Sequence, residues 1–150
     1  MPRNERGANR HPQGVRMFKS RSAVVGLVSG LASALLAYGV ALGVRIKTGQ
    51  DYPQLGFLPI ALAAVSSNLL GSWAFDFLVR WVPAPRTAFT FLVLAVAFLY
   101  TMAVGAHPPA DGFLEAVTPI HLMVAVTAIF LIPSLSSGAP RKPNSNRTKP

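Results

Sequence analysis

The chain alternates between four long apolar stretches and short polar connections. The apolar stretches cover residues 23–44, 58–79, 88–105 and 112–135 and are 22, 22, 18 and 24 residues long. Their hydrophobic side chains would occupy every face of a helix instead of a single stripe. About 20 helical residues cross a hydrocarbon core of about 30 Å. The pattern therefore predicts an all-α integral membrane four-helix bundle, with residues 23–135 as the membrane domain.

The first apolar stretch follows a basic segment, as the core of a signal peptide does. A signal peptide has an apolar core of about 7–15 residues. Residues 23–44 are longer than that and contain no charge. We therefore expect a retained membrane helix here and not a cleaved signal.

All the basic residues lie outside the apolar stretches. Of the 14 Lys and Arg residues, six lie in residues 1–22, two in the connection 80–87 and four in residues 136–150, whereas the other two connections hold only Arg45 and Lys47. Because basic residues accumulate on the cytoplasmic side of a membrane, this distribution predicts that both termini are cytoplasmic, N-in and C-in. Residues 1–22 and 136–150 are also rich in Pro, Asn, Ser and Gly, which predicts disordered basic tails.

Composition narrows the class of protein. Hydrophobic residues make up 51% of the chain and charged residues 13%, about half of the charged fraction typical of soluble domains. The net charge of +9 lies entirely in the two tails, where Phe18 is the only aromatic residue. Base stacking is therefore not supported, and we expect no nucleic-acid partner. Anionic lipid headgroups are the partner expected for the tails. An excess of Arg over Lys, ten to four, is typical of GC-rich bacteria and points to a bacterial plasma (inner) membrane.

No pattern of an enzyme is present in the sequence. The chain has no cysteine, which excludes disulfides, thiolate metal sites and cysteine nucleophiles. One histidine lies within the apolar stretches, which excludes a bis-histidine haem, and neither a Gly-rich phosphate loop nor a nucleophile elbow occurs. We therefore expect no cofactor, no metal and no catalytic residues.

Two glycine pairs mark the first apolar stretch, Gly26-x-x-x-Gly30 and Gly39-x-x-x-Gly43. Small residues four positions apart create a groove that another helix can approach closely. The groove would serve either a homo-oligomer or packing against another helix of the same chain.

Polar residues in the second stretch form a ridge. Asn68, Ser72 and Asp76 follow one another at intervals of four and share one helix face. Such a ridge is a candidate proton relay or cation site. The alternative is structural: Asp76 pairs with Arg80 one turn later, near the cytoplasmic end, and Asn68 bonds to a neighbouring helix.

His121 is the third residue of the candidate intramembrane polar site, after Asn68 and Asp76. A helix beginning near Gly112 would place it near the middle of the membrane, with Pro119 kinking the helix just before it. Alternatively, Thr118 caps a shorter helix that begins at Pro119, and His121 lies near the outer interface.

The role of His121 has two interpretations. It is a proton relay or ligand contact, as ionisable groups within membrane spans often are. Otherwise it hydrogen-bonds across the bundle to Asn68, Ser66 or Ser67.

Two short motifs resemble an uncharacterised family of small four-helix membrane proteins from high-GC Gram-positive bacteria. One motif is Phe57-Leu58-Pro59, and the other begins with His121-Leu-Met-Val-Ala-Val and ends with Leu-Ile-Pro133. The similarity covers roughly residues 23–135 and leaves out both tails. A methionine often precedes the histidine in that family, where this chain has Ile120. The resemblance implies the same fold and compartment, implies no known activity, and marks His121 and Pro133 as more than incidental.

Taken from the sequence, the expected function is that of a non-enzymatic membrane protein with a structural, accessory or partner-binding role. Its partners would be the lipid bilayer and either a second copy or another membrane protein. The alternative is a small transporter or channel subunit, acting as an oligomer with His121 and Asn68 lining the path.

Overall fold

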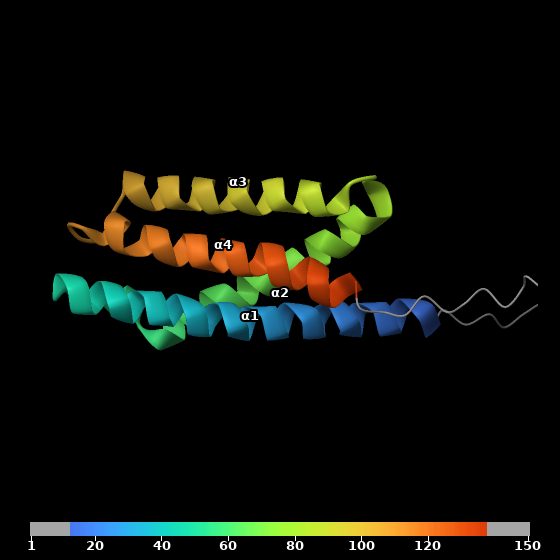
Figure 1. Cartoon of the computed structure of the whole chain (residues 1–150), viewed down its shortest axis with the longest axis horizontal. Coiled ribbons are helices and arrows are strands. Elements are labelled where there is room, and N and C mark those ends of the chain that lie inside the picture. The colour runs from blue at the N-terminus through green and yellow to red at the C-terminus, as the bar shows by residue number, and fades with distance from the viewer. Residues whose placement is uncertain (1–12, 138–150) are drawn as a thin grey trace, which may run out of the picture.

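The computed structural model describes residues 13–137, with side chains described from residue 21 onwards. This part of the chain forms four long helices, α1 (Gln13–Thr48), α2 (Phe57–Trp81), α3 (Pro85–Ala106) and α4 (Phe113–Ser137), and a short 3-10 helix, η1 (Pro53–Leu55). Short connections make consecutive helices antiparallel, so α1 begins and α4 ends at the same end of the bundle (Figure 1). We call this the termini end and the opposite one the loop end. The predicted all-α four-helix fold is confirmed.

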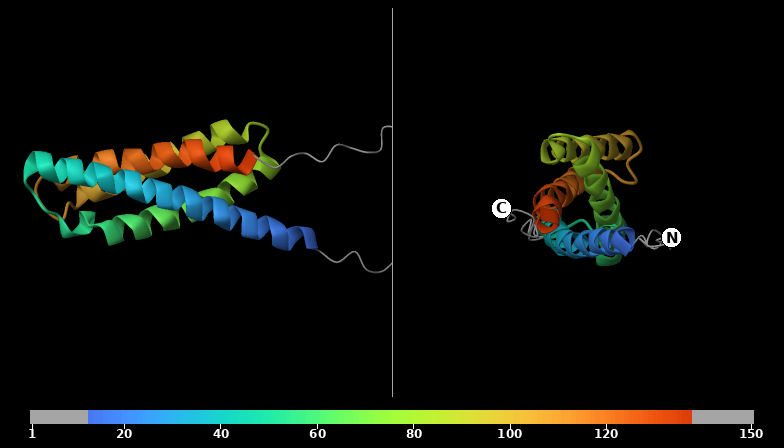
Figure 2. Two further views of the ribbon diagram at one scale, coloured as in Figure 1. Left: turned by 60° about the horizontal axis from the view of Figure 1, so that its bottom comes forward. Right: turned by 90° about the vertical axis from the view of Figure 1, so that its right-hand side faces the viewer.

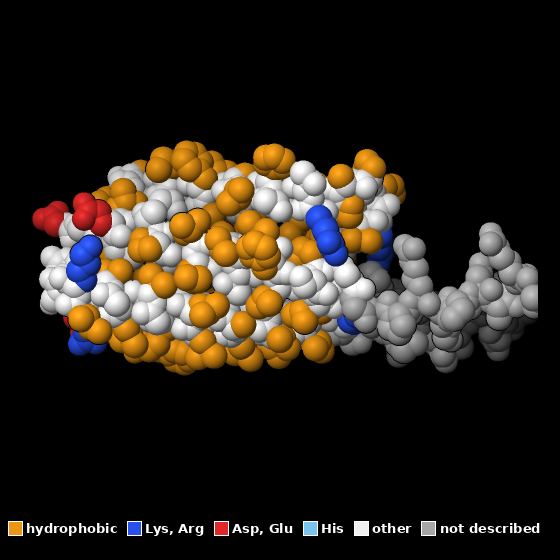
Figure 3. Space-filling model, in the orientation of Figure 1, with side chains coloured by type: hydrophobic (Ala, Val, Ile, Leu, Met, Phe, Trp, Pro, Cys, Tyr) orange, Lys and Arg blue, Asp and Glu red, His pale blue; other side chains and the backbone are white. Residues whose placement is uncertain are grey.

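Each long helix has the length and hydropathy of a membrane span. The apolar portions are Arg21–Thr48, Phe57–Trp81, Pro85–Ala106 and Phe113–Ser137. Charged side chains gather at the two ends of the bundle, and hydrophobic side chains cover the surface between them (Figure 3). This is the architecture of a multi-pass membrane protein.

The helices are arranged with α4 between α1 and α3 (Figure 1). Helix α1 makes its most extensive contacts with α2, and α4 makes extensive contacts with α1. Helix α3 is peripheral: of its residues, all of which the structure describes, only Phe89 is buried. The end-on view in Figure 2 shows α3 at the rim of the bundle.

Small residues allow α1 to lie close to its neighbours. The buried face of α1 carries mainly Gly, Ala and Ser at helical spacing, whereas Val and Leu occupy the exposed face. The small buried residues of this seam are Ser22, Gly26, Ser29, Gly30, Ser33, Ala34, Ala37 and Ala41. Because lipid tails are as apolar as leucine, helices in membranes associate through such close packing and not through the hydrophobic effect.

The core contains two hydrophobic clusters at different heights. The cluster near the termini end consists of Val25, Phe75, Phe89, Ala128 and Ile132. The cluster near the loop end consists of Ala37, Ala41, Ile60 and Ile120. Between them along α1 and α2 lie four buried polar residues, Ser29, Ser33, Asn68 and Ser72, which we call the central polar layer.

Helix α1 begins earlier than the sequence analysis predicted. Residues 13–22, assigned there to a disordered tail, are helical, and α4 likewise continues through residues 136 and 137. The charges of Arg16, Lys19 and Arg21 exclude this segment from a hydrocarbon core, but Lys and Arg are good helix formers, so the helix continues past the apolar stretch. The remaining parts of the predicted tails, residues 1–12 and 138–150, lie outside the described residues.

Helix α4 is continuous from Phe113 to Ser137 and contains both Pro119 and Pro133. The alternative prediction, a shorter helix that begins at Pro119, is therefore wrong. Thr118 does not cap a helix start; its hydroxyl donates to the carbonyl of Leu114 one turn earlier, at 2.7 Å. Hydroxyl groups that bond to carbonyls near a proline help a membrane helix to tolerate it.

Candidate functional site

Asn68 lies at the centre of the α1–α2 contact and is 1% exposed. Its Nδ2 atom donates to Ala64 O at 2.8 Å within α2 and to Ser33 Oγ of α1 at 3.3 Å. The expected bond to a neighbouring helix is thus present. Its Oδ1 atom is buried and has no hydrogen-bond partner among the described residues. Asn68 therefore links two helices while leaving one strong acceptor unsatisfied.

Ser29 and Ser72 of the central polar layer bond within their own helices. Ser29 Oγ donates to Gly26 O at 3.2 Å, and Ser72 Oγ donates to Leu69 O at 2.8 Å. These bonds satisfy the hydroxyl donors in an apolar environment where water is excluded. The central polar layer therefore contributes mainly through the close packing of its small side chains. The bond from Asn68 to Ser33 is the one described hydrogen bond of this layer that joins two helices.

The two glycine pairs of α1 have different surroundings. A Cβ atom on Gly26 would lie 2.8 Å from Leu69 Cα, and one on Gly30 would lie 2.7 Å from Val65 Cα, so both glycines contact the α2 backbone. Gly39 and Gly43 have nothing within 4 Å of a Cβ position. The first pair therefore serves packing within the chain, and the second faces the outside of the bundle.

Asp76 lies near the termini end of α2, half-buried against α1. Its Oδ2 atom accepts a hydrogen bond from the Ser22 hydroxyl, and the positive charges of Arg80 and Arg21 act on its carboxylate. Asp76 therefore takes part in the α1–α2 contact through Ser22, a partner that the sequence analysis did not consider.

His121 belongs to a different interface. Its Nδ1 atom lies 3.0 Å from Thr101 Oγ1 of α3, and its ring packs edge to face against Tyr100 with centroids 5.1 Å apart. The prediction that His121 hydrogen-bonds to Asn68, Ser66 or Ser67 is therefore wrong. The reason is that α4 turns this side chain towards α3, whereas Asn68 faces α1.

The Thr101 hydroxyl also bonds within its own helix. Thr101 Oγ1 donates to Ala97 O at 2.8 Å. With its proton engaged there, the hydroxyl accepts from His121 when Nδ1 carries the imidazole proton. His121 thus holds α3 against α4.

The three candidate intramembrane residues do not form one site. Asn68 and Asp76 lie in the α1–α2 contact, whereas His121 lies in the α3–α4 contact. Ser22 and Thr101 are the partners that the sequence analysis missed. The sequence carries no signal for either partner, because which side chains meet depends on how each helix is placed and rotated against its neighbour.

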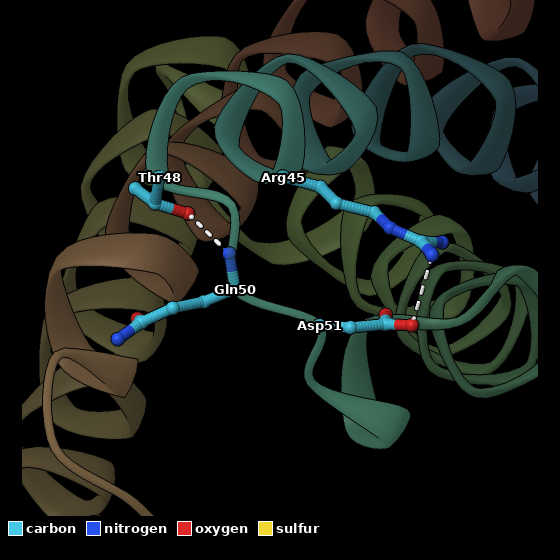
Figure 4. A network of polar contacts seen from close by, with 4 residues as sticks. All are labelled: Arg45, Thr48, Gln50 and Asp51. Atoms are coloured by element: carbon cyan, nitrogen blue, oxygen red, sulfur yellow. Dashed lines mark hydrogen bonds and ion pairs between the residues drawn. The ribbon is translucent and has the colours of Figure 1, made fainter.

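The loop end carries a separate polar network on the segment between α1 and η1 (Figure 4). Arg45 Nη2 lies 3.0 Å from Asp51 Oδ2, and the backbone N–H of Gln50 donates to Thr48 Oγ1 at 3.3 Å. Arg45 and Asp51 are both largely exposed to solvent, so this pair contributes little to stability.

Tyr52 joins two connections at the loop end. Its hydroxyl lies within hydrogen-bond distance of two acceptors, the side-chain oxygen Oε1 of Gln50 and the carbonyl of Asp111, the latter at 2.9 Å, and its one proton serves either of them. Its ring packs edge to face against Phe113. Gly112, between Asp111 and Phe113, has φ +73°, a conformation that glycine adopts without strain. Tyr52 therefore fixes the start of α4 relative to the end of α1.

Within residues 13–137, no three His, Asp or Glu side chains come close enough together to hold a metal ion. The polar side chains of the spans instead bond one helix to another, which is one of the interactions by which membrane helices associate. These features define a small multi-pass membrane protein. No protein-family model, curated protein or solved structure matches the chain.

Proposed function

We propose that this protein has a non-enzymatic structural, accessory or partner-binding role in a bacterial plasma membrane, with both termini in the cytoplasm. The observation that carries the proposal is that Asn68, Asp76 and His121 each bond to a neighbouring helix of the same chain. Polar side chains used in this way stabilise the packing of the bundle. The resemblance to an uncharacterised membrane family remains a prediction that is consistent with this role.

The alternative role, transport through an oligomer, needs His121 and Asn68 to line one path. In the described chain these residues occupy separate helix contacts, which favours the structural role. The test is to replace both with leucine and to measure unfolding of the protein and proton or Na⁺ flux in reconstituted vesicles. We expect the substitutions to lower stability and the wild type to show no flux. Flux in the wild type that disappears in variants of unchanged stability would contradict the proposal and support transport.

The surroundings of Gly39 and Gly43 support self-association as one form of partner binding. Both residues lie on the outside of α1 in open space, where a helix of a second copy could approach closely. Because the chain contains no cysteine, Gly43→Cys would introduce a single thiol. We expect it to form a disulfide-linked dimer in membranes, with Leu31→Cys on the same helix as a control. Equal cross-linking at both positions would contradict a specific interface.

The orientation of the protein in the membrane is also tested with single cysteine substitutions. Single cysteines at Gly49, in the connection after α1, and at Ala84, in the connection before α3, lie at opposite ends of the bundle. A membrane-impermeant maleimide added to intact cells should label the first and not the second. The reverse pattern would place both termini outside. We propose that the basic tails contact anionic headgroups of the cytoplasmic leaflet, and the reverse pattern would contradict this proposal as well.

A further inference from the structure

A cavity of about 240 Å³ opens at the termini end, where all four helices meet. By the same measure one water needs about 10–15 Å³, so the cavity is large enough for a polyatomic group. Its polar lining consists of Arg21, Ser22, Asp76, Arg86, Ser136 and Ser137. The side chains of Phe75, Val79 and Pro85 line the rest. We call this space the arginine cavity.

The two arginines reach the arginine cavity from different helices and are both anchored to the end of α4. Arg21 Nη2 of α1 donates to the carbonyls of Leu135 and Ser136, at 3.4 and 3.2 Å. Arg86 Nη2 of α3 donates to Ser137 Oγ at 3.0 Å. These acceptors are neutral, and each bond uses one nitrogen of a guanidinium that carries five N–H groups. Both arginines therefore keep further N–H donors for a ligand.

Asp76 is the third charged residue of the lining, and its single negative charge leaves the net charge of the lining positive. The Asp76 carboxylate accepts a bond from the Ser22 hydroxyl, and the charges of Arg80 and Arg21 both act on it. Asp76 therefore offsets part of the charge of Arg21, and the two guanidinium groups together with this one carboxylate leave the lining with a net charge of +1. An anion with several acceptor oxygens matches this lining, because guanidinium groups bind phosphate in a fork-like geometry.

The depth of the arginine cavity matches the phosphate level of a bilayer. Arg21 lies two residues before the uncharged stretch 23–44 of α1, and Ser137 lies two residues after the apolar stretch 112–135 of α4. Trp81, at the same end of α2, is 74% exposed, as expected for a side chain at the membrane interface. Basic pockets between membrane helices at this level bind lipid headgroups.

We propose that the arginine cavity binds a negatively charged phosphate group, with Arg21 and Arg86 as its two charged donors. The site is independent of the proposed structural role, and it lies within the folded bundle instead of in the tails. The phosphate would come from an anionic phospholipid headgroup or from a soluble phosphate, and the experiment distinguishes these sources.

The first arm measures lipid retention by native mass spectrometry of the full chain mixed with phosphatidylglycerol and phosphatidylcholine of equal chain length. We expect preferential retention of phosphatidylglycerol by the wild type. One basic residue near a membrane surface is worth about 1 kcal/mol, so Arg21→Gln and Arg86→Gln should each lower the preference about fivefold. Arg45→Gln removes the same charge at the loop end of α1 and should change it less than about twofold.

The second arm measures thermal unfolding in detergent with inorganic phosphate or with chloride at equal ionic strength. Stabilisation of the wild type by phosphate, lost in both glutamine variants, would assign the site to soluble phosphate. Preferential retention of phosphatidylglycerol without such stabilisation would assign it to lipid. Equal behaviour of the wild type and both variants in the two arms would overturn the proposal.

A further variant separates binding from folding, because Arg21→Gln also removes bonds to the end of α4. Val79→Trp keeps both arginines and fills the arginine cavity from α2. We expect it to lower the retention of phosphatidylglycerol, or the effect of phosphate, about as much as the loss of one arginine. Binding by this variant that equals that of the wild type would also overturn the proposal.

Discussion

Asn68 of α2 donates a hydrogen bond to Ser33 of α1 from a position that is buried between two helices, while its own carbonyl oxygen Oδ1 has no partner among the described residues. The pair therefore contains one favourable contact and one cost. A bond between membrane helices is worth about 0.6 kcal/mol on average, and an unsatisfied buried polar group costs about 1–3 kcal/mol. The value of Asn68 lies in the specific alignment of the two helices more than in net stability.

The first prediction concerns this pair. Ser33→Ala should lower the free energy of unfolding by about 0.6 kcal/mol, because it removes the bond between the helices and leaves the unsatisfied oxygen of Asn68 in place. Asn68→Ala should lower it less than Ser33→Ala or raise it, because it removes the unsatisfied oxygen as well. The double variant should show a coupling of about 0.6 kcal/mol. Unfolding in detergent micelles measures all three. Ser72→Ala, which removes a bond within α2, is the control, and its effect should be independent of Ser33.

The second prediction compares two glycines of α1. Gly30→Ala should destabilise the protein by about 1–3 kcal/mol, because its Cβ would lie 2.7 Å from the α2 backbone and the helices would have to separate. The added Cβ of Gly43→Ala would have no atom within 4 Å, so this variant should stabilise the helix by up to about 1 kcal/mol because alanine has a higher helix propensity than glycine. Thermal unfolding of both variants provides the test. Equal effects would mean that α1 and α2 do not pack as described.

The third prediction concerns the hydrogen bond between Thr101 and His121. Thr101→Val should release the loop-end half of α3, because this bond is one of the described attachments of that half to α4. Hydrogen-exchange mass spectrometry in nanodiscs should show faster exchange near residues 97–106, with α1 and α2 unchanged. Thr90→Val on the same helix is the matched control, since the Thr90 hydroxyl donates within α3 to Arg86 O. The same acceleration in both variants would refute the role of the bond.

The fourth prediction concerns the loop end. Tyr52→Phe removes the hydroxyl that bonds to Gln50 Oε1 and to the Asp111 carbonyl and keeps the ring contact with Phe113, so it should cost about 1 kcal/mol. Asp51→Asn breaks the exposed pair with Arg45 and should cost less than about 0.5 kcal/mol, an effect that falls further at high salt. Chemical unfolding at two salt concentrations distinguishes the two variants. A larger loss in Asp51→Asn would contradict this ranking.

The positions of the helices could be predicted because they depend on local properties of the chain. An uncharged run of 22 residues, such as 23–44, has the length of a membrane span whatever its neighbours are. The helical conformation of residues 13–22 was not predicted because basic residues mark the limit of the apolar core and do not stop a helix. The continuity of α4 through Pro119 was left open for a related reason, since a membrane helix tolerates proline.

The partners of the polar residues could not be predicted in the same way, because they depend on how each helix is rotated about its axis. Asn68 was expected to bond to another helix and does so, but nothing local identifies Ser33 as its partner. His121 was assigned to the wrong neighbour because its direction depends on the contact between α3 and α4. The two glycine pairs of α1 look alike in the sequence and differ only in which side faces α2.

The seam of small residues on α1 also limits how this sequence can change over evolutionary time. Positions such as Leu27, Val28 and Leu31 face outwards, so any apolar side chain of any size would be accepted there. Gly30 and Ala37 are enclosed, and each added carbon atom there would push two helices apart. Divergent copies of this chain should therefore differ freely in the bulk of one side of α1 and keep the other side small.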